Sequence, residues 1–247
     1  MSAKRTVLAG LLLCAAAVVA AAQEAPVQAT PPAAPPLFIR WTVYPTASLS
    51  RYDYNNDVDQ FEVRIYVEVR LGSQEGAAVP EAIVTSLGAR LDFVTDHFEK
   101  RIVYEKGPRP AEVDLEVAVK DRPPLRERQP LPDWLVLTEP RPSVIETGKD
   151  LGVHWQFDRF EAPVDVMAYD FRTGKEFLRR TNQPGTSVVV PAAAVPVDTI
   201  VRLYVIQSWL YKRYLDGPAY ARGSEIVVIP WSQVFFRTRG PAQGGRP

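Results

Sequence analysis

Residues 61–70 read FEVRIYVEVR, and this stretch decides the fold. Apolar side chains occupy every second position: Phe61, Val63, Ile65, Val67 and Val69. The positions between them are Glu62, Arg64, Tyr66, Glu68 and Arg70. Successive side chains of a strand point to opposite faces, so this period of two predicts a half-buried β-strand.

Short segments of the same kind continue along the chain. A first set lies at 82–85, 91–94, 101–104 and 113–119, with turns at Gly72, Gly76, Gly88 and Gly107-Pro108. A second set lies at 135–137, 151–157, 164–171, 187–190, 200–214 and 226–237, with a tight turn at Gly174. Closely spaced strands without helical periodicity predict an all-β fold of antiparallel β-sandwiches.

The strand sets are separated by a charged, proline-rich stretch. Residues 121–132 read DRPPLRERQPLP, and proline cannot occupy a central strand. We therefore expect a first sandwich at 37–122, a linker at 123–132 and a second sandwich at 133–238, followed by a disordered tail at 239–247.

The first module carries a motif of a known family. The segments Pro80-Glu81-Ala82-Ile83-Val84-Thr85 and Gly88-Ala89-Arg90-Leu91 resemble a strand–turn–strand of bacterial immunoglobulin-like extracellular modules. The resemblance implies that an exposed aromatic residue and a strand follow, and Phe98 to Tyr104 fits that place.

The second module resembles fibronectin type III domains. Val153-x-Trp155 is similar to their early strand with a core tryptophan, and residues 196–205 are similar to a later strand. Val201 stands where that family has its corner tyrosine. These resemblances imply tandem sandwich modules of an exported protein and carry no catalytic residues, and a fold alone would assign no function.

The amino end has the features of an export signal. Lys4 and Arg5 precede the apolar run 7–22, and Ala20-Ala21-Ala22 supplies small residues before a cleavage site. We expect a signal peptide at 1–22, no transmembrane span after cleavage, and a periplasmic or extracellular protein. Lipidation at Cys14 is disfavoured, because Leu13 is too large for a lipoprotein signal.

The mature part begins with a proline- and alanine-rich spacer, QEAPVQATPPAAPP, at 23–36. Cys14 is the only cysteine and is removed with the signal, so no disulfide or thiolate site is expected. The formal net charge is zero, which argues against nucleic-acid binding because that function needs a basic face.

No catalytic or cofactor motif is present. The two histidines, His97 and His154, belong to no zinc or nucleophile signature. We therefore expect no enzyme and no cofactor. An enzyme would require distant acids such as Asp96, Glu99 and Asp158 to meet in one pocket.

One segment has alternating oxygen ligands that would suit calcium: Asp53, Asn55, Asp57 and Asp59. It is no EF-hand, because Val58 and Arg64 replace the required glycine and glutamate. The alternative is a polar loop whose Asp and Asn residues favour turns.

The segment 200–237 is predicted to form one long hairpin with an aromatic, basic outer half. The candidate binding residues are Trp209, Tyr211, Lys212, Arg213, Tyr214 and Tyr220. Tyr, Trp and Arg dominate protein-interface hot spots, which favours an envelope protein as partner. A glycan is the alternative and would need a planar row of exposed rings. In a third, purely structural alternative, the hairpin packs between the two modules and its aromatic residues belong to a core.

Overall fold

The computed structural model describes residues 34–49, 59–104, 109–132, 134–141, 144–157, 162–207 and 211–240. In these residues the chain is almost entirely β-structure, which confirms the all-β prediction, and one 3-10 turn lies at Ala192–Ala194. None of the described residues forms a helix long and apolar enough to cross a membrane. All strands lie within 35–247, which forms one compact unit.

The strands follow one another in chain order. They are β1 (Leu37–Leu49), β2 (Asp59–Leu71), β3 (Ile83–Ser86), β4 (Ala89–Arg90), β5 (Asp92–Val94), β6 (His97–Tyr104), β7 (Glu112–Ala118), β8 (Leu125–Pro130), β9 (Leu135–Glu139), β10 (Val144–Glu146), β11 (Leu151–Phe157), β12 (Val164–Asp170), β13 (Glu176–Gln183), β14 (Ser187–Val190), β15 (Ile200–Gln207), β16 (Tyr211–Tyr214), β17 (Glu225–Val228) and β18 (Trp231–Arg239).

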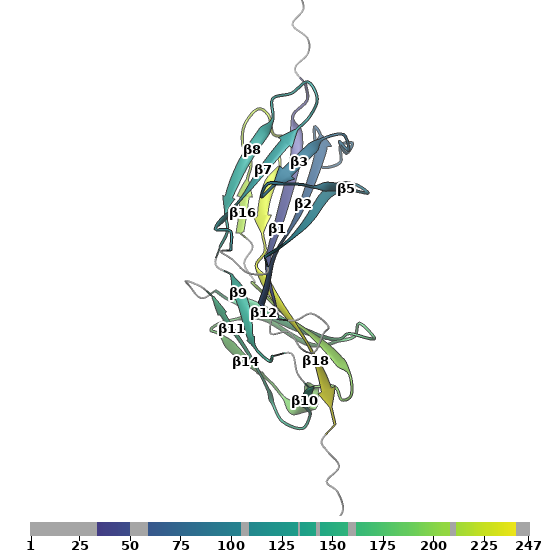
Figure 1. Cartoon of the computed structure of the whole chain (residues 1–247), viewed down its shortest axis with the longest axis vertical. Coiled ribbons are helices and arrows are strands. Elements are labelled where there is room, and N and C mark those ends of the chain that lie inside the picture. Colours follow the sequence, from purple (N-terminus) through teal and green to yellow (C-terminus); the bar gives the residue numbers. More distant parts are fainter. Residues whose placement is uncertain are drawn as a thin grey trace, which may run out of the picture. The chain divides into compact units, whose positions relative to one another are not determined.

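Three sheets build two sandwiches (Figure 1). One sheet of eleven strands runs in the order β13-β12-β15-β18-β1-β2-β6-β5, and β10, β17 and β16 attach beside this path. A four-stranded sheet, β4-β3-β7-β8, packs on its β1–β2 part, and a three-stranded sheet, β14-β11-β9, packs on its β12–β15–β18 part.

The first sandwich has the core that the alternation in 61–70 predicts. Val63, Ile65, Val67 and Val69 of β2 are all buried. They pack with apolar residues of β1, β3 and β7 in one cluster, which includes Trp41. The removal of this apolar surface from water is the main stabilising term.

In the second sandwich the three-stranded sheet faces β13, β12, β15 and β18, and β10 pairs beside β18. Val153 and Trp155 of β11 are both buried in its core. The tight turn predicted at Gly174 is present, since its N–H donates to the carbonyl oxygen of Asp170 at 2.8 Å and its φ is 69°.

β1 and the carboxyl-terminal hairpin join the two sandwiches. The hairpin predicted at 200–237 is present, with β15 pairing β18 and β16 pairing β17. β1 pairs in parallel with β17 through residues 40–43 and with β18 through residues 46–49. As a result Leu215, Ile226 and Val228 are buried in the core of the first sandwich, although they fall in the range expected for the second module.

The expected linker also differs from the structure. Within 123–132 the chain forms β8, which pairs antiparallel with β7. β8 is an edge strand, and edges tolerate proline at their ends because an unpaired side needs no N–H donor.

Two further differences concern the first module. β1 was not predicted from the sequence LFIRWTVYPTASL, because Pro45 lies within it, yet the strand runs continuously through this proline. Phe98, expected to be exposed, is the second residue of β6, is only 3% exposed and packs in the first core.

The placement of β17 predicts the effect of a substitution. Ile226→Ala should lower the free energy of unfolding by about 2–5 kcal/mol, because Ile226 is fully buried and a cavity would remain. Val189→Ala, at a side chain that is 60% exposed, should change it by less than about 0.5 kcal/mol. Urea unfolding measures both, and equal effects would show that β17 lies outside the core.

Candidate functional site

The hairpin residues proposed from the sequence do not form one surface. Trp209 lies outside the described residues. The ring of Tyr211 packs against the first core, and its hydroxyl accepts a hydrogen bond from Gln207 Nε2 at 3.2 Å. Tyr211 is therefore held inside the fold.

Arg213 and Tyr220 attach the hairpin to β8. Arg213 Nη2 lies 2.9 Å from Glu127 Oε2 and donates to the carbonyl oxygen of Arg128 at 3.1 Å. The hydroxyl of Tyr220 donates to Glu127 Oε1 at 2.8 Å. Burial, together with the Glu127 carboxylate, raises the pKa of Tyr220 far above its ordinary value. These contacts hold the hairpin against β8 and are therefore structural.

Lys212 and Tyr214 lie on the other side of β16, on the outer face of the eleven-stranded sheet. Lys212 Nζ is 2.5 Å from Glu225 Oε2 and 4.8 Å from the centroid of the Tyr214 ring. Glu225 also binds Arg40 at 3.1 Å, and despite burial these two cations hold its pKa below the usual range. Tyr214 is 58% exposed, so it is the proposed aromatic residue that is open to solvent in the described part of the hairpin.

A larger group of rings and guanidinium groups occupies the same outer face where β2, β1, β18, β15 and β12 meet. We call it the aromatic–arginine face. Its members are Tyr44, Arg64, Tyr66, Tyr169, Phe171, Arg202, Tyr204, Trp231 and Phe235. They are half-buried except for Phe171, which is exposed.

Five members of this face contact one another in a series that runs from Arg64 to Phe235. The Arg64 guanidinium lies 5.8 Å from the centroid of the Trp231 ring, which stacks on Tyr204 with centroids 5.4 Å apart. Arg202 in turn lies 4.4 Å from the Tyr204 centroid and 5.4 Å from that of Phe235. Such cation–π contacts fix both the ring and the guanidinium.

Two acceptors orient the arginines. Arg64 Nε lies 2.6 Å from Glu62 Oε1, and Glu62 is only 1% exposed although it sits on the outer face. Arg202 donates through Nε and Nη2 to Gln233 Oε1 at 3.2 and 3.1 Å. The buried Glu62 carboxylate also binds Arg101, as a buried charge must be paired.

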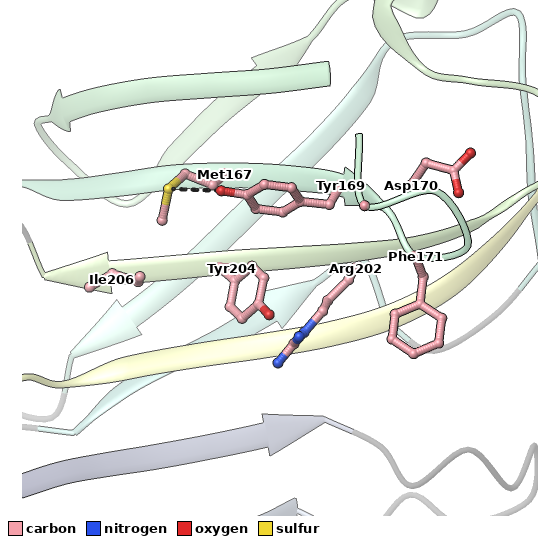
Figure 2. A pocket seen from close by; sticks show the side chains of 8 residues that line it. Met167, Tyr169, Asp170, Phe171, Arg202, Tyr204 and Ile206 are labelled. Carbon is pink, nitrogen blue, oxygen red and sulfur yellow. Dashed lines mark hydrogen bonds between the residues drawn. The ribbon is translucent and has the colours of Figure 1, made fainter. Parts of the chain in front are cut away.

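The face is hollowed on both sides of a ridge formed by Tyr204 and Ile206. The first hollow, about 410 Å³, is lined by Met167, Tyr169, Asp170, Phe171, Gly174, Arg202 and the ridge (Figure 2). The second hollow, about 300 Å³, is lined by Tyr44, Arg64, Tyr66, Ile229, Trp231 and the ridge. Figure 2 shows Tyr204 and Arg202 on β15 beside Tyr169 on β12.

The other predicted candidates do not line the two hollows where the structure describes them, although the ring of His97 lies 5.7 Å from that of Tyr66. Asp53, Asn55 and Asp57 lie outside the described residues, and only the backbone of Asp59, at the start of β2, is described. His97 begins β6, with Nδ1 3.0 Å from Asp96 and Nε2 3.4 Å from Glu99. Asp158 lies outside the described residues, and the residues that are described contain no group of three metal-ligating side chains.

Sequence reasoning missed the aromatic–arginine face because its members come from strands far apart in the chain. A signal was present in 200–206, IVRLYVI, where Arg202, Tyr204 and Ile206 alternate with buried valine and leucine.

No protein-family model and no curated protein matches the chain. Among solved structures, the fibronectin(III)-like modules of Clostridium thermocellum CbhA share 10% identity, covering 84% of this chain and 98% of theirs, with a TM-score of 0.27. The BSP domain of a biofilm-associated protein shares 12% over 81% of this chain and 29% of its own, with a TM-score of 0.23. DIP-gamma IG1+IG2 shares 8% over 83% and 98%, with a TM-score of 0.24.

The bond between Tyr220 and Glu127 predicts a pH dependence. Tyr220→Phe should reduce the free energy of unfolding by about 1 kcal/mol at neutral pH through loss of this hydrogen bond. Burial and the Glu127 carboxylate raise the pKa of Tyr220 above the ordinary value of about 10, so the folded protein holds this proton more tightly than the unfolded chain.

The stabilisation by the Tyr220–Glu127 hydrogen bond is therefore complete below the pKa of tyrosine in the unfolded chain, about 10. It declines as the pH rises from there toward the higher pKa of Tyr220 in the folded protein. Urea unfolding at several pH values should show a constant difference between wild type and Tyr220→Phe up to about pH 9, and a shrinking one from about pH 10 upward. A difference that grows above pH 10 would contradict the assignment.

Proposed function

We propose that the chain is an exported, non-enzymatic module of the cell envelope that binds or scaffolds another protein through its aromatic–arginine face. The observation that carries this proposal is the series of rings and guanidinium groups around two adjoining hollows. Tyr, Trp and Arg are the residue types that supply most of the binding energy in protein interfaces.

Export is proposed from the sequence of the first 22 residues and from the proline-rich spacer that follows. A non-enzymatic role is proposed because no catalytic motif accompanies the β-sandwich modules. The partner is accordingly sought in the periplasm or at the cell surface.

The ring geometry favours a protein partner over the glycan alternative. A sugar platform needs ring planes that lie flat and face solvent. Three ring pairs of the outer face are edge-to-face instead, at 90° for Tyr44–Tyr66, 84° for Tyr169–Tyr204 and 89° for Phe171–Phe235. Such rings present edges and hydroxyl groups between hollows, which suits protein side chains.

A capture experiment tests the proposal. The tagged chain, incubated with envelope extract, should retain a protein that Tyr204→Ala combined with Phe171→Ala loses at least tenfold, since hot-spot truncation costs about 2 kcal/mol or more. Val189→Ala, at an exposed side chain of β14, is the matched control and should retain it. Thermal unfolding checks that each variant is folded.

One further variant separates this face from the β16 edge of the hairpin. Tyr214→Ala, also on the outer face but at the β16 edge, should weaken capture less than the double variant. Capture that is equal in all variants contradicts the proposed surface. If the chain retains no protein but sediments with purified cell wall, the glycan alternative replaces it.

A further inference from the structure

We propose that the two hollows bind a proline-rich segment of the partner in the polyproline II conformation, laid across the ridge of Tyr204 and Ile206. This inference rests on the proposed protein-binding function and specifies the chemistry of its ligand.

The walls of the hollows are of the kind that extended proline-rich peptides require. Both share Tyr204 and Ile206, and the remaining apolar lining comes from Met167, Tyr169 and Phe171 in the first and from Tyr44, Tyr66, Ile229 and Trp231 in the second. Proline rings pack between aromatic side chains that stand up from a surface, and grooves of this type select the preformed polyproline II helix.

The spacing of two walls, one from each hollow, is close to the repeat of that helix. Met167 and Tyr169 lie on β12 and Trp231 on β18, and β15 lies between these two strands. Neighbouring strands are about 4.8 Å apart, so the β12 wall of the first hollow and the β18 wall of the second are separated by roughly 10 Å. A polyproline II helix has three residues per turn and rises about 3.1 Å per residue, which puts positions i and i+3 about 9 Å apart on one side.

The polar groups around the hollows are mainly donors. Arg64 and Arg202 carry positive charge, and the hydroxyls of Tyr44, Tyr66 and Tyr204 can donate, whereas that of Tyr169 already donates to Met167 Sδ at 3.6 Å. The carboxylate in the first hollow, Asp170, uses Oδ1 to accept the backbone N–H groups of Arg172 at 2.9 Å and Thr173 at 3.2 Å.

A proline-rich chain complements this arrangement in charge and in hydrogen bonding. Proline has no backbone N–H, so a run of prolines presents carbonyl oxygens with partial negative charge. Its backbone has no donor that would need an acceptor on the protein. A β-strand ligand would bring N–H groups that need acceptors of their own, whereas a proline-rich chain does not.

Fluorescence anisotropy with fluorescein-labelled decaproline and the full chain tests the inference. We expect saturable binding, at least tenfold weaker for Tyr204→Ala and unchanged for Val189→Ala, a control at an exposed valine of β14. Tyr204→Phe keeps the ring and should lose much less. A labelled (Gly-Ser)5 peptide of equal length, which has no polyproline II preference, should not bind.

The outcomes separate this inference from the proposed function. If decaproline does not bind, or binds wild type and folded Tyr204→Ala equally, the inference is wrong, even where the double variant still loses the envelope protein. If decaproline binds through Tyr204 but no envelope protein is retained, the hollows recognise polyproline II and the proposed envelope function is what fails.

Discussion

The pairing of β1 with three other strands is the constraint on which the rest of the structure depends. Along all thirteen residues β1 is antiparallel to β2, and on its other edge it is parallel first to β17 and then to β18. One strand near the amino end therefore holds the last hairpin of the chain. Without this pairing, β16 and β17 would leave the first core, and β2 and β18 would no longer belong to one sheet.

Two buried serines make this junction possible. The hydroxyl of Ser224 accepts the N–H of Ile39 at 3.0 Å, where β17 begins beside β1. The hydroxyl of Ser232 donates to the carbonyl oxygen of Ala47 at 2.7 Å and accepts the N–H of Leu137 on β9 at 3.0 Å. Buried backbone groups need partners, and at these points the hairpin's side chains supply them.

Local patterns in the sequence predicted the strands but not how they are shared. The alternation in 61–70 and in 200–206 directly reports which face is buried, since a strand's side chains have a period of two. Pairing between residue 40 and residue 225 leaves no local trace, so the limits of the modules could not be read from the chain. The linker interpretation of 123–132 failed for a related reason, because proline content does not distinguish an edge strand from a loop.

The same reasoning explains why the four expected residues on β16 do not share one surface. Tyr211 and Arg213 alternate with Lys212 and Tyr214 along β16, so the four side chains must divide between two faces. Tyr211 faces the first core and Arg213 reaches β8, whereas Lys212 and Tyr214 join the outer face. An aromatic, basic composition identified the segment, but only the period of two decides which members can meet a ligand.

What distinguishes the outer face from an ordinary solvated sheet surface is that its side chains are already immobilised. Arg64 is held by the buried Glu62 and by Trp231, and Arg202 by Gln233 and two rings. Ordering a long side chain on binding costs about 0.5–1.5 kcal/mol, and here folding has met that cost before any ligand arrives. A surface whose arginines are fixed in this way loses little entropy on association, so its rings and guanidinium groups can contribute most of their contact energy to affinity.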